Sequence, residues 1–336
     1  MDVAVFVVDG VADFGLTAVL EVLRTANGLA SDLPDPPRPF GIRTVSAGGA
    51  VRSAHGYTIP AEPVKTVLAE GPDLLLVPAV EIPQPEALVR EVSGASGRTV
   101  VHALNAAREA GVRVAAACTA TFYLAEAGVL DGVRATTSWW LGPMLRRRYP
   151  RVEVDETRTL CVGEDVITAG GALAHLDLAL SLVAASSPAL ADLVSRYLLI
   201  GNRTTQQDFA APEILARGNP LAAAFERRVR SRLGESLQVA ALAGELGVTE
   251  RSLQRTRQAE LGMSPRELIT EIRLQRAIHL LRTTGLTVDA VAARVGYLNG
   301  GTLRTLIRRR RGLSVGEVRG SGSPWLSAPL PVPSPD

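Results

Sequence analysis

The order of hydrophobic and polar residues separates a front part with alternating strand and helix patterns from a back part that is helical throughout. Residues 3–10 form a continuous apolar run typical of a buried strand, and residues 14–29 follow with helical spacing. Further strands are predicted at 40–49, 73–80 and 112–120, a hairpin at 158–170, and helices at 85–92, 98–111, 122–130, 139–150 and 171–185. This alternation predicts an α/β domain over residues 1–200, with a parallel sheet covered by helices on both faces.

Residues 237–319 contain the same helical unit written twice. Val239, Leu242, Ala243 and Leu246 have the i, i+3, i+4, i+7 spacing of an amphipathic helix. A glycine then stands where the chain must turn. Leu237, Val239, Ala241, Ala243 and Gly247 recur 49 residues later as Leu286, Val288, Ala290, Ala292 and Gly296. Each copy therefore predicts a helix-turn-helix, and the repeat predicts two such units packed together in an all-α domain over residues 220–319.

The second helix of each copy carries polar side chains at the positions expected to face outward. Arginine and glutamine have the hydrogen-bonding geometry that recognises guanine and adenine in the major groove. The run 308–311 consists of four arginines, which suits contacts to phosphates, although such a run is also compatible with a solvated surface. The residues predicted to contact double-stranded DNA are Arg251, Gln254, Arg255, Thr302, Arg304, Thr305, Arg308 and Arg309.

A predicted helix over residues 265–282 joins the two copies. Its 18 residues would span roughly 27 Å. This length is close to the ~34 Å that separates successive major grooves on one face of DNA. We therefore expect the two recognition helices to enter neighbouring grooves of one duplex.

Charge supports a division of roles between the two parts. The net charge of +2 combines an acidic front with a basic back: residues 217–319 hold 19 arginines and nine acidic residues, whereas residues 1–216 hold 17 basic and 24 acidic residues. Lys65 is the only lysine, so the basic residues of the back part are all arginines. This distribution predicts that only the back part meets a polyanion.

The duplicated region resembles the DNA-binding domain of the AraC family of bacterial transcription regulators. The resemblance is carried by LAGELGVTERSLQR, LGMSPRELITEIRLQRA and the frame VAARVGY…LRTLIRRRRGLS. In that family the second helix of each copy contacts DNA, which here implies the residues of 251–255 and 302–305 named above. The second copy departs from the family at Gly301, where a serine is usual.

A second resemblance covers most of residues 1–200. The segment AAACTATFYLAEAG places Cys118 between a predicted strand and a helix, a turn at which we expect the helix dipole to lower the thiol pKa. This segment, with ATTSWW further on, resembles the PfpI-like, or class I glutamine amidotransferase-like, domain and in particular the GlxA branch of AraC-family regulators. The resemblance implies a flavodoxin-like sheet, sensing of a small effector and homodimerisation.

Three interpretations of Cys118 stay open at this point. In the first it is the nucleophile of a cysteine hydrolase or amidase, with His175 as the remaining base. In the second it lines an effector pocket with Thr119, Ser138 and Trp139, and in the third it is an inert core thiol. Departures from the family weigh against catalysis: Thr119 stands where the wider fold often has histidine, and Ser138 replaces the histidine of T-T-H-W. Gly15 occupies a position where an acidic residue is expected.

Taken together, these features predict a sequence-specific transcriptional regulator that is not an enzyme. Two cysteines and four scattered histidines predict no metal site, and we expect no cofactor. We expect a cytoplasmic protein with no membrane segment, which contacts RNA polymerase if it is an activator. Residues 201–219 are predicted to be a linker, and the Pro/Ser/Gly-rich residues 320–336 a disordered tail.

Overall fold

The structure is a computed structural model that describes residues 1–82, 84–201, 220–261 and 264–320, with the side chains of 256–261 and 320 left aside. The chain divides into two units, residues 1–210 and 211–336. The predicted linker, apart from Gly201, and the predicted tail, apart from the backbone of residue 320, lie outside the described residues.

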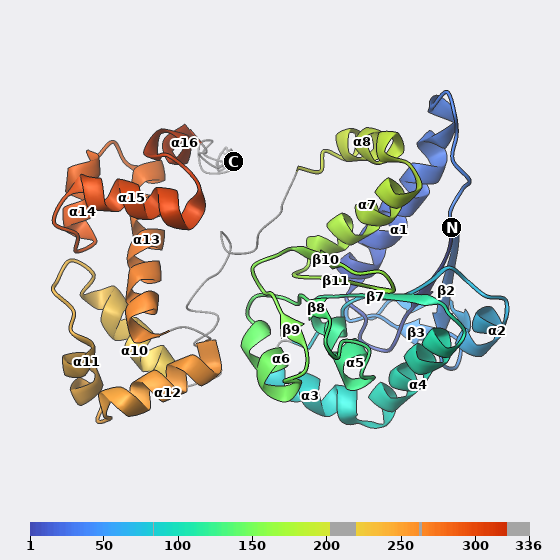
Figure 1. Cartoon of the computed structure of the whole chain (residues 1–336), viewed down its shortest axis with the longest axis horizontal. Coiled ribbons are helices and arrows are strands. Elements are labelled where there is room, and N and C mark those ends of the chain that lie inside the picture. The colour runs from blue at the N-terminus through green and yellow to red at the C-terminus, as the bar shows by residue number, and fades with distance from the viewer. Residues whose placement is uncertain (83, 202–219, 262–263, 321–336) are drawn as a thin grey trace, which may run out of the picture. The chain divides into compact units, whose positions relative to one another are not determined.

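The first unit is built on a seven-stranded sheet with the order β10-β11-β7-β6-β1-β2-β5 (Figure 1). All neighbouring strands are parallel except the hairpin of β10 and β11. The order β2-β1-β6-β7-β11 is that of a flavodoxin-like sheet, so this prediction is confirmed. The strands are β1 (Asp2–Phe6), β2 (Gly41–Ser46), β5 (Glu62–Pro63), β6 (Leu74–Val77), β7 (Arg113–Ala117), β10 (Leu160–Val162) and β11 (Val166–Ala169).

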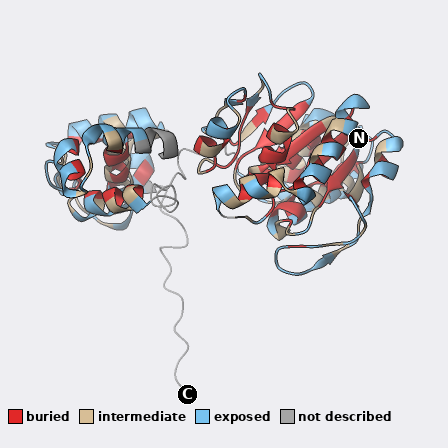
Figure 2. Cartoon of the chain, turned by 90° about the horizontal axis from the view of Figure 1, so that it is seen from below, coloured by how far each residue is buried: buried red, intermediate tan, exposed pale blue. Residues whose placement is uncertain are grey.

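Each face of this sheet is covered by helices and has its own core. Successive residues of a strand point to opposite faces, so Ala4 and Phe6 belong to one core and Val3 and Val5 to the other. Both faces of the central strands β1, β6, β7 and β11 are therefore buried (Figure 2). The first face is covered by α2 (Val64–Ala69), α3 (Pro85–Ser93), α4 (Ala95–Glu109), α5 (Thr121–Glu126) and α6 (Gly142–Arg148), and the second by α1 (Asp13–Leu29), α7 (Ala174–Ser186) and α8 (Pro188–Tyr197).

Shorter elements complete this unit. Two strands form an antiparallel pair, β3 (Val51–Arg52) with β4 (Thr58–Ile59), and two form a parallel pair, β8 (Arg134–Ala135) with β9 (Glu153–Val154). Two 3₁₀ turns follow longer elements, η1 (Ala30–Asp32) after α1 and η2 (Cys118–Ala120) after β7. No helix in the described ranges is both long enough and apolar enough to cross a lipid bilayer.

The described part of the second unit is helical. The two helix-turn-helix motifs are α11–α12 and α14–α15, and their turns contain Gly247 and Gly296 with φ angles of 68° and 81°. These left-handed conformations favour glycine, as the sequence pattern predicts. The helices are α10 (Pro220–Ser231), α11 (Val239–Glu245), α12 (Glu250–Leu261), α13 (Pro265–Thr283), α14 (Val288–Arg294), α15 (Gly300–Arg311) and α16 (Val315–Gly320).

Helix α13 contributes to the cores of both motifs. It begins with a capping box in which Ser264 and Glu267 satisfy each other's backbone N–H groups. Leu268, Ile269 and Ile272 pack in the first motif's core, whereas the second core takes Leu274, Ala277, Leu280 and Leu281. The connecting helix is thus an integral part of both motifs.

Candidate functional site

Helix α12 presents a polar surface opposite its buried side. Leu253 is fully buried in the first core, whereas Arg251, Gln254 and Arg255 are exposed. The hydroxyl of Thr249 accepts a hydrogen bond from the Ser252 amide at 3.1 Å and so caps the start of the helix. The three predicted base-contacting side chains of the first motif are therefore available to a ligand.

Helix α15 has the same organisation. Leu303 and Ile307 are buried in the second core, and the five predicted DNA contacts of this helix are exposed: Thr302, Arg304, Thr305, Arg308 and Arg309. The hydroxyl groups of Thr302 and Thr305 donate to Asn299 Oδ1 at 3.2 Å and to the Gly301 carbonyl at 3.1 Å. These two threonines can therefore offer an acceptor and a methyl group to a base, while their protons are used within the helix.

The run of four arginines at the end of α15 does not act as one group. Arg308, Arg309 and Arg310 are exposed, but the Arg311 side chain is only 7% exposed and forms an ion pair with Glu271 of α13. The expectation that all four contact phosphates is wrong for Arg311. Its charge is used to attach the recognition helix to the connecting helix.

The start of α15 is held from two sides. Asn299 Oδ1 accepts from the Thr302 amide at 2.9 Å, and Asp289 Oδ1 of α14 accepts from the Gly300 amide at 2.7 Å. A β-carbon at Gly300 would lie 2.9 Å from that same Asp289 oxygen. Sequence reasoning missed Asn299 and Asp289, although an asparagine before two glycines is itself a capping signal.

In the first unit, the predicted sharp turn at Cys118 is present. Cys118 directly follows β7 and has a φ of 58°, a conformation uncommon for a residue with a side chain. Its Sγ lies 2.9 Å from Ser138 Oγ, which also accepts a hydrogen bond from the Gly171 amide at 3.1 Å. Cys118 is half-buried. The side chain that lies within hydrogen-bonding distance of its thiol is therefore a hydroxyl and not a base.

The pKa of Cys118 is opposite in direction to the sequence-based prediction. Burial raises the pKa of the thiol, and this effect exceeds the lowering by the Ser138 hydroxyl and the Thr119 amide. The helix that follows the turn, α5, contains only six residues. A short helix contributes little to a dipole effect compared with desolvation, so the expected activation of Cys118 is wrong.

His175 does not act as a base for Cys118. Its Nε2 accepts from the Ala79 amide at 3.2 Å, and its Nδ1 lies 2.8 Å from the Ala172 carbonyl. Burial lowers the His175 pKa to about 4, and no hydrogen bond links it to Cys118 in the described structure. A β-carbon at Gly15 would lie 2.6 Å from Nε2, so the imidazole fills the space beside this glycine. The interpretation in which His175 serves as the base for Cys118 is therefore wrong. His175 is instead a neutral residue of the core.

Two other residues of the predicted effector pocket have different surroundings. The Thr119 hydroxyl accepts from the Val80 amide at 2.9 Å and donates to the Val80 carbonyl at 2.7 Å, so it joins the turn to the segment that follows β6. Trp139 is half-buried. The structure brings Cys118 and Ser138 into contact, whereas Thr119 is buried and bonded to the segment that follows β6.

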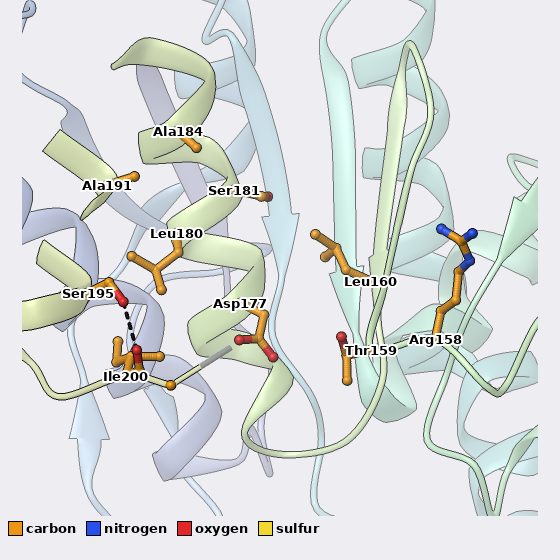
Figure 3. Close-up of a pocket in the computed structure, with 11 residues that line it drawn as sticks. Arg158, Thr159, Leu160, Asp177, Leu180, Ser181, Ala184, Ala191, Ser195 and Ile200 are labelled. Atoms are coloured by element: carbon orange, nitrogen blue, oxygen red, sulfur yellow. Dashed lines mark hydrogen bonds between the residues drawn. The ribbon is translucent and has the colours of Figure 1, made fainter. Parts of the chain in front are cut away.

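A cavity of about 620 Å³ lies elsewhere in this unit (Figure 3). Thr159 and Leu160 of the hairpin line one side, and Leu180 and Ser181 of α7 line the other. The Ser195 hydroxyl donates to the Ile200 carbonyl at 2.7 Å at the α8 end. None of the four predicted pocket residues lines this cavity.

Comparison with known proteins matches both units. Residues 1–185 match the model of the DJ-1/PfpI family, and residues 242–321 match a helix-turn-helix domain. The chain is 30% identical over 297 residues to the HTH-type transcriptional regulator CdhR of Pseudomonas aeruginosa, covering 86% of this chain and 82% of CdhR. It is 25% identical over 213 residues to the HTH-type transcriptional regulator GlxA of Rhizobium meliloti, covering 62% of this chain and 65% of GlxA.

Among solved structures, an AraC family transcriptional regulator from Pseudomonas putida aligns with a TM-score of 0.49 and 21% identity, over 59% of this chain and 98% of that one. The family matches and the CdhR relationship agree with the α/β unit and the paired helix-turn-helix motifs described above. The chain belongs to the DJ-1/PfpI family, and it is a DNA-binding transcriptional regulator that combines such a domain with helix-turn-helix motifs, as CdhR does.

Proposed function

We propose that this regulator recognises its operator by placing α12 and α15 in two successive major grooves on one face of the duplex. The observation that carries this proposal is that both recognition helices belong to motifs whose cores are built on the single helix α13. This helix has 19 residues and so is about 28 Å long. That length suits the ~34 Å repeat of the major groove.

The exposed side chains have different roles in this proposal. Arg251, Gln254 and Arg255 recognise bases in one groove, and Arg304 with the Thr302 and Thr305 side chains does so in the next. Arg308 and Arg309, near the end of α15, contact phosphates and fix the position of the helix without selecting a sequence. Arg311 has no such role because it is paired with Glu271.

The α/β unit is proposed to sense a small effector and to form a homodimer. The Cys118 turn at the carboxyl end of β7 supports an effector site there, because ligands of such sheets bind beyond the carboxyl ends of the strands. Cys118, Thr119, Ser138 and Trp139 remain the proposed residues of this site. As a bacterial regulator that binds chromosomal DNA, the protein would act in the cytoplasm, and as an activator it would contact RNA polymerase.

Selection of binding sites from random duplex DNA with the full chain tests the DNA-binding proposal. We expect enriched sequences that contain, for each bound subunit, two conserved blocks whose centres are about 10 base pairs apart. Arg255→Ala and Arg304→Ala should each weaken binding to the selected site by about 1–3 kcal/mol. Arg276→Ala, at an exposed position of α13, is the matched control. Failure to enrich any sequence, or equal losses on selected and random DNA, would contradict the proposal.

A further inference from the structure

We propose that Arg273 is a positioning residue that sets the spacing and rotation between the two recognition helices, and thereby the spacing between operator blocks that the protein accepts. This inference rests on the proposed function, because it requires both helices to bind one duplex. Arg273 lies in α13 between Ile272 of the first core and Leu274 of the second. It therefore stands where the two motifs meet.

The guanidinium of Arg273 donates hydrogen bonds to two backbone carbonyls, one in the turn before the first motif and one in the turn within the second motif. Its Nη2 donates to the Glu235 carbonyl at 2.6 Å, in the turn between α10 and α11. Its Nη1 donates to the Gly296 carbonyl at 3.2 Å, in the turn between α14 and α15. The same group lies 5.6 Å from the centre of the Tyr297 ring. One side chain thus joins the segment before the first helix-turn-helix to the turn of the second.

The two turns also approach each other directly. A β-carbon at Gly296 would lie 2.5 Å from the Leu233 carbonyl oxygen and 2.5 Å from Arg273 Nη2. A β-carbon at Gly234 would lie 3.5 Å from the Arg294 carbonyl oxygen. Because both turns carry a glycine at this point, their backbones pack closely against each other beside the Arg273 guanidinium. We call Leu233–Glu235, Arg273 and Gly296–Tyr297 the inter-motif joint.

The chemistry of the joint fits a positioning role. The apolar contacts of α13 favour burial but are not directional, so they do not by themselves fix a rotation between the motifs. Hydrogen bonds are directional, and the planar guanidinium presents its donors at fixed angles to two separate carbonyls. A lysine ammonium keeps the charge but lacks this planar, two-pronged geometry.

Rotation between the recognition helices matters because DNA is helical. Each base pair inserted between two contacted blocks turns one block by about 35° relative to the other, since a turn contains about 10–10.5 base pairs. A rigid joint restricts binding to one spacing, whereas a loosened joint tolerates several. The spacing dependence therefore reports on the joint separately from overall stability.

The test uses the full chain and five duplexes in which the separation of the selected blocks is changed by −2 to +2 base pairs. We expect wild-type affinity to fall at least tenfold when the spacing changes by two base pairs. With Arg273→Gln the best affinity should fall, and the five affinities should lie within about threefold of one another. Arg273→Lys should give an intermediate profile, and the exposed Arg276→Gln should keep the wild-type profile.

The outcomes separate this inference from the proposed function. Wild-type protein that binds no selected duplex would contradict the proposed function itself. Wild-type protein with a sharp spacing optimum, together with an Arg273→Gln protein that keeps the same optimum at uniformly lower or unchanged affinity, would overturn the positioning role alone. Should Arg273→Gln fail to fold, Arg273→Lys decides: a spacing profile identical to that of the wild type contradicts the inference.

Discussion

The hydroxyl oxygen of Ser138 lies 2.9 Å from the sulfur of Cys118, and the same oxygen accepts the Gly171 amide. A serine hydroxyl does not remove a proton from a thiol near neutral pH, so this contact positions the thiol without activating it. The geometry keeps the turn that an enzyme of this fold would use, while His175 is held by backbone groups. The turn therefore does not activate Cys118 for nucleophilic attack, which agrees with the effector-binding role proposed for it.

Cys118 should react slowly with alkylating agents. Burial raises its pKa, so little thiolate is present at neutral pH. In a Cys161→Ser background, which leaves Cys118 as the only thiol, iodoacetamide at pH 7.5 should react at least tenfold more slowly with the folded chain than with the unfolded chain. Ser138→Ala should slow it further, since the hydroxyl lowers the thiol pKa. Reaction faster than in the unfolded chain would show an activated thiol.

The α/β unit should lose stability on acidification between about pH 6.5 and pH 4. The His175 pKa is about 4 in the folded chain, against an ordinary value of 6.5, so the unfolded state binds the proton first. The free energy of unfolding should therefore fall by about 3 kcal/mol. This loss is complete below pH 4, the folded-state pKa of His175, and absent above pH 6.5. Denaturant unfolding of wild type and His175→Gln at several pH values measures it.

The matched control for this experiment is His55→Gln. Asp13 raises the pKa of His55, so protonation of this exposed residue stabilises the folded state as the pH falls, with the opposite sign. Removal of His55 should therefore leave the loss between pH 6.5 and 4 in place, whereas removal of His175 should abolish it. An unchanged pH profile in His175→Gln would contradict the assignment.

Alanine substitutions at the two turn glycines should differ in their cost. Gly247 and Gly296 both have left-handed φ angles, so alanine costs about 1–2 kcal/mol at each from backbone strain. Gly247 has open space around its missing β-carbon, whereas Gly296 faces the Leu233 carbonyl and Arg273. We expect Gly296→Ala to lower the free energy of unfolding of the helical unit by more than Gly247→Ala does. Equal losses would mean that the joint is not tightly packed.

Two arginines near the end of α15 should have separable effects. Arg309 is exposed, so Arg309→Ala should reduce the salt dependence of DNA binding by about 0.9 in log–log slope without altering sequence preference. Arg311 is buried in an ion pair with Glu271, and its removal leaves that carboxylate unpaired. Arg311→Ala should therefore destabilise the fold by about 3–5 kcal/mol. Thermal unfolding and salt titration of both variants distinguish these roles, and the reverse pattern would contradict them.

Local patterns predicted the features that depend on neighbouring residues. The parallel sheet follows from alternation of strands and helices, whereas the flavodoxin-like order of its strands is implied by the family resemblance. The turns at Gly247 and Gly296 follow from helical periodicity that ends in glycine. The ion pair of Arg311 could not be predicted from local patterns, because its partner Glu271 lies 40 residues away. His175 likewise depends on Ala79, 96 residues away.

Arg273 illustrates the same limit in the candidate site. In the sequence it reads as one of several charges on the connecting helix, yet it binds carbonyl groups 38 and 23 residues away. A signal was present, since Arg273 stands between the apolar residues Ile272 and Leu274 in a helix that is buried by two motifs. Its partners are backbone atoms, which leave no trace in side-chain patterns.

The central claim is that α12 and α15 occupy separate, successive major grooves. The most direct measurement is base-methylation interference on the selected operator with the wild type, Arg255→Ala and Arg304→Ala. For each bound subunit we expect two blocks of interference about 10 base pairs apart, with Arg255→Ala removing interference in one block and Arg304→Ala removing it in the other. A single block, or loss of the same block in both variants, would contradict the account.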